Sequence, residues 1–244
     1  MCFLVNKGKK MAVFLGELIG TFLMILLGNG VVANVLLNQS KGIGGGWIVV
    51  TFGWGFAVAI SVYLVGTLSG AHLNPAVTLA FALSKATPWN IVHIYWLGQM
   101  FGAILGSVFV WFAYYAHFQA TENAHFKLLC FATAPAIRNL KWNAVTEIIG
   151  TAVLILGIFG ILDAHNQLSS GLGPYLVGIL VVSIGLSSGG PTGYAINPAR
   201  DLGPRIVYSL LYGKKSADWK YAWVPGLAPF AGTALAFGLY KALF

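Results

Sequence analysis

Ser69-Gly70-Ala71-His72-Leu73-Asn74-Pro75-Ala76-Val77-Thr78 is the stretch that decides the fold, because its Asn-Pro-Ala tripeptide returns at Asn197-Pro198-Ala199. Both copies follow a long apolar segment. Asparagine is a preferred N-cap, and proline is favoured at the first helical position, where its missing N–H has no intrahelical partner to lose. Each tripeptide therefore predicts a helix that starts within the membrane. Two polar helix starts in lipid are tolerated where they line a water-filled path, which predicts a pore.

The composition is that of a membrane protein. The chain has 244 residues, of which 58% are hydrophobic and 8% charged, with a mean hydropathy of +0.80, whereas a soluble domain carries about 25% charged residues. A spanning helix needs about 20 apolar residues. Six such segments lie at about 11–37, 47–68, 91–116, 143–163, 174–188 and 221–243. We therefore expect an all-α protein with six transmembrane helices in contact with membrane lipid.

Charge and motifs exclude other classes of function. The net charge is +8, but the fourteen Lys and Arg residues are scattered, without the basic run that nucleic acid would need. The sequence has no nucleophile–base pair, no histidine or cysteine spacing typical of a metal site and no phosphate-binding loop. We therefore expect neither an enzyme nor a nucleic-acid partner, and no cofactor or metal.

The chain repeats itself. Glu17-Leu18-Ile19-Gly20-Thr21 matches Glu147-Ile148-Ile149-Gly150-Thr151, and each Asn-Pro-Ala starts a short apolar stretch of about half a membrane thickness. Three spans per half is an odd number, so the halves must have opposite orientations. The sequence predicts an inverted repeat, about 11–116 and about 143–243, within one channel domain covering 1–244, whose two re-entrant half-helices meet near the midplane. Gly98, Gly102 and Gly106 are expected to let helices pack closely.

With its six spans, doubled Asn-Pro-Ala and repeated glutamate, the sequence resembles the major intrinsic protein family of aquaporins and aquaglyceroporins. The resemblance implies an aquaporin-like fold, a pore within each chain, a homotetramer and cytoplasmic termini. Lys7, Lys9 and Lys10 favour an inside N-terminus. Because more basic residues would then lie outside, the charge rule alone does not decide the topology. The short loops are typical of a bacterial plasma-membrane protein.

The resemblance also implies site residues. The amides of Asn74 and Asn197 would hold passing oxygens where two positive helix ends meet, and Arg200 would bind solute oxygens and exclude cations, as in aquaporin-type pores generally. Alignment on the motifs places four residues at the selectivity filter: Trp54, Gly185, Tyr194 and Arg200. Gly185 with Trp54 indicates the glycerol-conducting branch, with a wide, half-apolar opening.

Tyr194 departs from the resemblance, because glycerol facilitators typically have phenylalanine there. Its hydroxyl could narrow the pore or point away from it. We expect it to shift preference towards small solutes with polar ends, such as dihydroxyacetone, urea or undissociated lactic acid. Without the alignment, Trp54 and Tyr194 would instead be interpreted as anchors at the membrane interface.

Four further polar residues have implied roles beside the pore. Glu17 and Glu147 would each anchor the neighbouring Asn-Pro-Ala loop, although mid-membrane carboxylates can also couple protons. His72 would order its loop or sense pH, and Asp201 would have a structural role, contacting backbone or another chain. We predict a passive channel for glycerol, other small neutral solutes and water that excludes ions and protons. The alternatives are a water-selective channel and a proton-coupled secondary transporter that uses Glu17 and Glu147.

Overall fold

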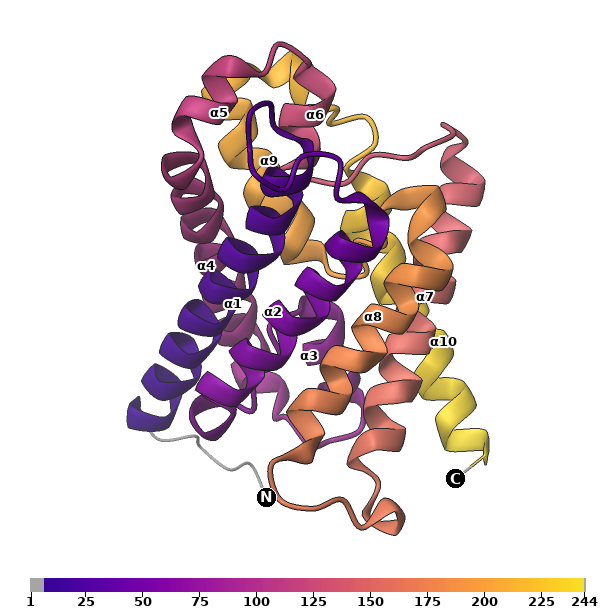
Figure 1. Cartoon of the computed structure of the whole chain (residues 1–244). Helices are drawn as coiled ribbons and strands as arrows, with labels where there is room; N and C mark the ends of the chain where they lie inside the picture. Colours follow the sequence, from indigo (N-terminus) through magenta and orange to yellow (C-terminus); the bar gives the residue numbers. More distant parts are fainter. Residues whose placement is uncertain (1–6, 244) are drawn as a thin grey trace.

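The computed structural model describes residues 7–243, and within them the secondary structure is helical throughout (Figure 1). Five helices are long and apolar enough to cross a membrane. They are α1 (Lys7–Leu36), α2 (Gly46–Ser69), α4 (Val92–Ala113), α7 (Leu140–Leu162) and α8 (Leu172–Thr192). The sixth expected span is α10 (Trp223–Leu243), which has 21 residues and is therefore about 31 Å long. The six predicted spans are confirmed.

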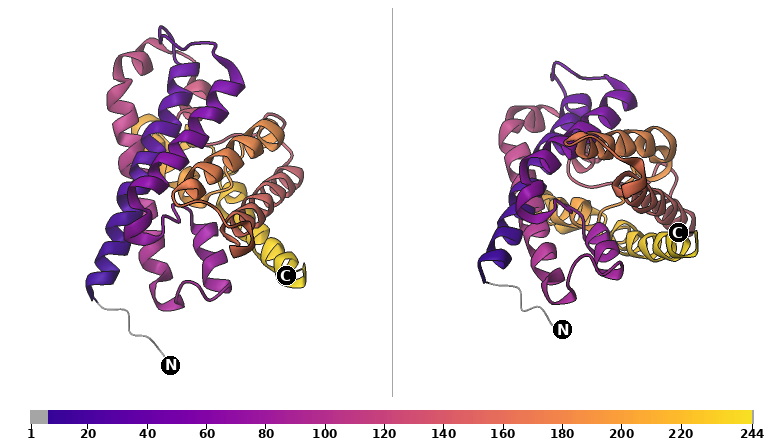
Figure 2. Two further views of the ribbon diagram at one scale, coloured as in Figure 1. Left: turned by 60° about the horizontal axis from the view of Figure 1, so that its bottom comes forward. Right: turned by 90° about the horizontal axis from the view of Figure 1, so that it is seen from below.

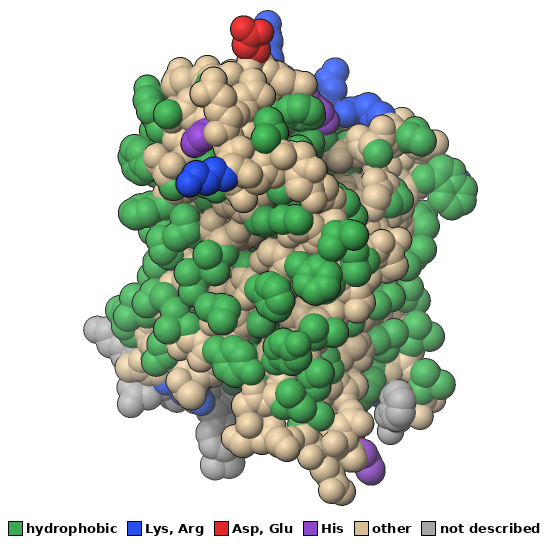
Figure 3. All heavy atoms as spheres, viewed as in Figure 1, with side chains coloured by type: hydrophobic (Ala, Val, Ile, Leu, Met, Phe, Trp, Pro, Cys, Tyr) green, Lys and Arg blue, Asp and Glu red, His purple; other side chains and the backbone are tan. Residues whose placement is uncertain are grey.

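The surface agrees with a membrane setting. On the face shown in Figure 3, hydrophobic side chains cover a broad band around the middle, and the lysine and arginine side chains lie near the two ends. The exposed large hydrophobic residues of the spanning helices include Phe56, Leu64, Leu97, Phe109 and Leu227. An apolar belt between charged ends matches a hydrocarbon layer between two aqueous phases.

Glycines allow the helices of each half to cross closely. In the first half, a Cβ added to Gly102 of α4 would lie 2.4 Å from the carbonyl oxygen of Leu18 on α1. In the second half, a Cβ on Gly232 of α10 would lie 2.5 Å from the carbonyl oxygen of Ile148 on α7. Gly102 and Gly232 are 130 positions apart, as are Glu17 and Glu147, so the repeat extends from sequence to packing. The helix-packing interpretation of the α4 glycines is confirmed.

Two shorter helices follow the Asn-Pro-Ala copies. They are α3 (Pro75–Leu83), with nine residues, and α9 (Pro198–Tyr212), with fifteen. Each packs against the opposite half: α3 contacts α10, and α9 contacts α4. Thr233 of α10 donates a hydrogen bond to the Ala76 carbonyl at 3.1 Å. Because each half-helix packs against the opposite half, the two halves are joined. They lie side by side when viewed from the end where α10 finishes (Figure 2).

The connection between the halves forms structure that the sequence analysis did not predict. After α4 the chain forms α5 (Tyr115–Ala120) and α6 (Ala124–Leu129), and residues 130–139 then lead to α7. Three 3₁₀ turns, Trp89–Ile91, Ala164–Asn166 and Lys214–Ala217, complete the connections. The α5–α6 region lies at one end of the molecule, while α1 begins and α10 ends at the other (Figure 1).

Candidate pore constriction

The two half-helices begin against each other. Asn74 caps α3 by accepting from the Ala76 N–H at 2.9 Å, and Asn197 caps α9 by accepting from the Ala199 N–H at 3.1 Å. Each amide also donates to a carbonyl of the opposite loop: Asn74 Nδ2 to Ile196 and Asn197 Nδ2 to Leu73, both at 2.8 Å. A primary amide has two N–H bonds, so one remains on each asparagine. Pro75, Ala76, Pro198 and Ala199 form the first turns of the half-helices behind these amides.

The loops before the half-helices adopt an unusual backbone twice. Ala71 and Leu73 have φ values of 50° and 53°, and Tyr194 and Ile196 have 38° and 41°. Non-glycine residues rarely adopt positive φ, and such strain persists only where the surroundings fix it. Within residues 7–243, no protein group donates a hydrogen bond to the carbonyls of Ala71, His72, Tyr194 and Ala195. These carbonyls are therefore free to accept from a solute.

Two buried glutamates hold these loops. Glu17 accepts from the backbone N–H groups of His72 at 2.9 Å and Leu73 at 2.7 Å. Glu147 accepts from those of Ala195 at 3.0 Å and Ile196 at 2.7 Å. Glu17 has two further donors, the Ser69 hydroxyl at 2.6 Å and the Gln99 amide at 2.7 Å. Both carboxylates thus provide the partners that non-helical backbone needs inside a membrane.

Two cavities lie next to each other inside the chain, and the first of them contains the Asn-Pro-Ala region. One, of ≈ 220 Å³, is lined by Asn74, Asn197 and His72 and extends to the end where α10 finishes. The other, of ≈ 370 Å³, lies under the α5–α6 region and is lined by Trp47 and His125. The lining residues that the two cavities share are Trp54, Tyr194 and Arg200. Three of the four predicted filter residues therefore form the boundary between the cavities.

Arg200 is held on two sides. Its guanidinium carbon lies 4.1 Å from the centroid of the Trp54 ring, which is the geometry of a cation–π contact. Its Nη1 donates to the Phe131 carbonyl at 3.3 Å and to Asn29 Oδ1 at 3.4 Å. No protein acceptor in the described chain faces its Nε or Nη2. Those N–H groups are available to a solute oxygen at the boundary of the cavities.

Gly185 lies against the Tyr194 side chain. It lines neither of the two cavities, which differs from its predicted place on the filter surface. A Cβ at this position would lie 2.8 Å from Tyr194 Cζ and 2.7 Å from Thr51 Cγ2. The Tyr194 ring therefore occupies the space that the glycine leaves, and its hydroxyl is buried without a hydrogen-bond partner among residues 7–243. The hydroxyl lies at the helix α8 surface, while the ring borders the cavities.

His72 lines the first cavity and is tightly packed. Its ring stacks on Tyr95 with centroids 4.3 Å apart and on Phe81 at 4.7 Å, and Nδ1 lies 3.2 Å from Thr78 Oγ1. Within residues 7–243, no group of three or more His, Cys, Asp or Glu side chains is placed to hold a metal ion.

Asp201 contacts backbone and a residue that the sequence analysis missed. Its Oδ2 accepts from the Thr133 N–H at 2.8 Å, and its Oδ1 accepts from Arg205 Nε at 2.8 Å. Asp201 and Arg205 are four residues apart on α9, a spacing at which helical side chains of opposite charge meet. That spacing could have identified Arg205. Nothing in the local sequence connects Asn29 and Phe131 to Arg200, because the contacts join residues 171 and 69 positions apart.

The fold and the site together define a membrane channel: six spans enclose two half-helices, and two cavities meet at an arginine beside the opposed helix ends. The sequence matches the Major intrinsic protein family over residues 5–240, and the chain belongs to this family.

Relatives and solved structures give the branch that it resembles. A protein of Thermotoga maritima described as "Probable glycerol uptake facilitator protein" is 53% identical over 236 residues, covering 96% of this chain and 100% of the relative. The "Glycerol uptake facilitator protein" of Bacillus subtilis is 50% identical, covering 96% of this chain and 85% of the relative. The X-ray structure of the aquaglyceroporin from Plasmodium falciparum has a TM-score of 0.87 at 32% identity, covering 95% of this chain and 96% of that one.

Proposed function

We propose that the protein is a passive channel for glycerol, and that Trp54, Tyr194 and Arg200 form its selectivity filter. The observation that carries the proposal is that these three residues alone are shared by the linings of the two cavities. Any solute that moves between the cavities passes them. The glycerol facilitators to which the chain is about half identical support the choice of solute.

The chemistry of the filter suits a polyol. Glycerol has a face of C–H groups and a row of hydroxyls. The Trp54 and Tyr194 rings offer an apolar wall, while Arg200 and the free loop carbonyls offer hydrogen-bond donors and acceptors. Each water molecule that a hydroxyl loses is then replaced by a protein partner, so dehydration is compensated. Water and other small neutral solutes fit the same pattern.

Ion exclusion follows from charge. Arg200 lies in the first turn of α9, and the N-terminus of α3 faces that of α9. Each helix N-terminus has about half a positive charge, so the region combines a full and two partial positive charges where water is scarce. A cation or hydronium ion is repelled there. Gly185 contributes space for the Tyr194 ring, and Asn74 and Asn197 contribute their remaining amide N–H groups.

We propose further that Glu17 and Glu147 anchor the loops and that His72 orders its loop. The support is that both carboxylates accept hydrogen bonds from backbone N–H groups of these loops. We also propose a bacterial plasma-membrane location, supported by bacterial relatives. Cytoplasmic termini are proposed too, supported by the start of α1 and the end of α10 lying on one side (Figure 1). The homotetramer is proposed from the family to which the chain belongs.

Glycerol flux into proteoliposomes tests a channel against a coupled transporter. A channel gives flux that rises linearly with the glycerol gradient and does not respond to an imposed proton gradient. Saturation at millimolar glycerol, together with acceleration by inward protons, would contradict the proposal. Glu17→Gln and Glu147→Gln would then be the first variants to measure, because a coupled mechanism needs one of these carboxylates.

A further inference from the structure

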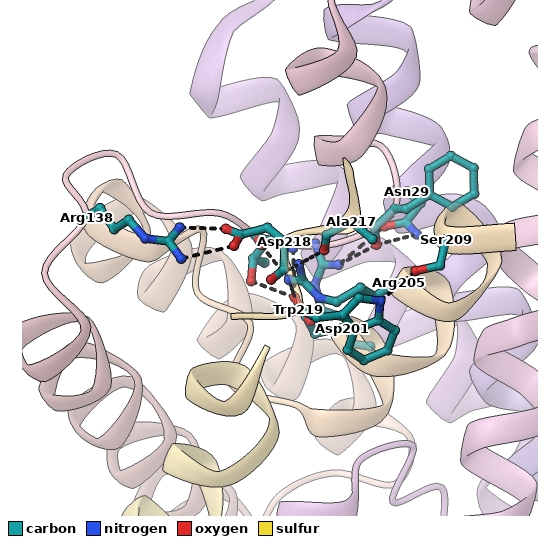
Figure 4. A network of polar contacts seen from close by, with 11 residues as sticks. Asn29, Arg138, Asp201, Arg205, Ser209, Ala217, Asp218 and Trp219 are labelled. Carbon is teal, nitrogen blue, oxygen red and sulfur yellow. Dashed lines mark hydrogen bonds and ion pairs between the residues drawn. The ribbon is translucent and has the colours of Figure 1, made fainter. Parts of the chain in front are cut away.

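Arg205 is a fully buried arginine that joins three segments at the α5–α6 end of the protein (Figure 4). Its Nη2 donates to Asp201 Oδ2 at 3.0 Å and to the Thr133 carbonyl at 2.7 Å, and its Nη1 donates to the Ala217 carbonyl at 2.7 Å. With Nε on Asp201 as well, every guanidinium nitrogen has a protein partner. A buried ion pair needs such complete hydrogen bonding to offset desolvation.

The Asp201–Arg205 pair holds one residue of the 130–139 segment, Thr133, through the peptide units on both sides of it. Asp201 Oδ2 accepts from the Thr133 N–H at 2.8 Å and from the Thr133 hydroxyl at 2.7 Å. Arg205 donates to the carbonyl of the same residue. Thr133 is thus fixed through its N–H, its hydroxyl and its carbonyl by two side chains of α9.

The carbonyl of Phe131, two residues before Thr133, orients Arg200. The Phe131 oxygen accepts from Arg200 Nη1 at 3.3 Å and from Asn29 Nδ2 at 3.2 Å. On its other side the segment is attached to α6, through the Phe131 N–H to the Leu128 carbonyl at 2.9 Å. A short chain held at both ends keeps the intervening carbonyl in place. Releasing Thr133 leaves that carbonyl fixed from one end.

The Asp201–Arg205 pair lies in the same half of the molecule as the filter residue Arg200. The Asn-Pro-Ala copies are 123 positions apart, so Arg200, Asp201 and Arg205 correspond to Val77, Thr78 and Ala82 in α3. The first half-helix has neither the filter cation nor the ion pair. A pair that served only to support a half-helix would be equally useful in both halves.

We propose that Asp201 and Arg205 are positioning residues of the filter. They fix Thr133 so that the Phe131 carbonyl holds the Arg200 guanidinium against Trp54, and this sets the width of the passage. The inference rests on the proposed function, because it concerns the selectivity of the same constriction.

The test is the ratio of erythritol to glycerol permeability in proteoliposomes that contain Arg205→Gln or Asp201→Asn. Erythritol has one more CHOH unit than glycerol. A shaped pocket discriminates against one extra carbon by about tenfold or more. A looser filter is expected to lose part of this discrimination, which would raise the ratio by about threefold. Loss of folded protein lowers both permeabilities alike and leaves the ratio unchanged. Arg205→Lys, which keeps the charge, is expected to lie between the wild type and Arg205→Gln.

Arg138→Gln is the matched control. Arg138 lies in the same 130–139 segment and pairs with Asp218 at 2.7 Å near the surface, and among the described residues its guanidinium has no hydrogen bond to Thr133 or Phe131 (Figure 4). Its removal is expected to leave the ratio at the wild-type value. Thr133→Ala, which removes one hydrogen bond, is the milder variant if the others do not fold, and it is expected to shift the ratio in the same direction.

An unchanged ratio in every variant that folds would overturn the inference. An increase in Arg138→Gln as large as in Arg205→Gln would also overturn it, because the effect would then be general to the segment. If the wild type does not conduct glycerol, the proposed function fails. If the wild type conducts and the ratio does not move, the positioning role alone fails.

Discussion

The guanidinium carbon of Arg200 lies 4.1 Å from the centre of the Trp54 ring, and this contact joins α9 to α2 across the two halves of the chain. The face of an indole ring attracts a cation, while the Phe131 carbonyl holds the guanidinium from another side. The charge is therefore fixed at the wall of the passage between the two cavities. Solute binding and ion exclusion are both consequences of this placement.

Removing the charge is expected to separate these two effects. In Arg200→Ala, we expect glycerol passage to be retained and the cation leak to increase by roughly 100-fold. A permeating cation about 5 Å from the Arg200 charge is repelled by about 3 kcal/mol at an effective dielectric constant of 20. Potassium-driven collapse of a membrane potential, read with a voltage-sensitive dye, measures the leak. A tight membrane in Arg200→Ala liposomes that still conduct glycerol would show that the exclusion lies elsewhere.

Gly185→Ala is expected to reduce glycerol permeability by about tenfold, because overpacking a filled site costs about 1–3 kcal/mol. The new Cβ would lie 2.8 Å from Tyr194 Cζ and push the ring towards the passage. Gly190→Ala is the matched control on the same helix, since a Cβ there has nothing within 4 Å. The double variant Gly185→Ala/Tyr194→Ala is expected to recover permeability. No recovery would contradict the steric explanation.

Tyr194→Phe is expected to leave the ratio of glycerol to urea permeability unchanged. The Tyr194 hydroxyl is buried against α8, where a Cβ added to Gly185 would lie 3.0 Å from it, and this burial keeps it from a solute. Removing an unsatisfied buried hydroxyl is expected to raise stability by about 1 kcal/mol, which thermal unfolding in detergent measures. A changed ratio would mean that the hydroxyl faces the passage, as the sequence-based expectation about polar solutes assumed.

Glu147→Gln is expected to lower the free energy of unfolding by about 2 kcal/mol. Both carboxylate oxygens of Glu147 accept from buried backbone N–H groups, whereas glutamine has one oxygen and would face the second N–H with its own NH₂ group. Glu17→Gln is expected to have a larger effect, since Glu17 has four donors. In both variants glycerol flux per folded protein is expected to stay insensitive to a proton gradient. Equal stability of either variant and the wild type would contradict the anchoring role.

Local chemistry explains what the sequence could predict. Helix starts at Asn74 and Asn197 follow from capping, and six spans follow from the length of apolar segments. The close crossings at Gly102 and Gly232 follow from the repeat. These features depend on neighbours in the chain or on a fixed offset, and both can be read without coordinates.

The remaining features depend on contacts between distant residues. The Phe131 carbonyl meets Arg200 because the segment after α6 folds back over α9, which no local pattern indicates. Gly185 was expected to widen the opening, but the Tyr194 ring fills its space. Arg205 is the exception, because its spacing of four residues from Asp201 is a local signal. The filter residues themselves stay a prediction from the family resemblance, and the contact between Phe131 and Arg200 could not be predicted from local sequence.

Stopped-flow light scattering on proteoliposomes is the most direct test of the account. Vesicles are mixed with excess sucrose or with excess glycerol, with empty liposomes as the control. A glycerol channel is expected to give rapid shrinkage in sucrose, and in glycerol a shrinkage followed by fast reswelling. Gly185→Ala is expected to slow this reswelling, and Gly190→Ala is expected to leave it unchanged. Shrinkage in glycerol without reswelling would contradict this account and would make the protein a water-selective channel.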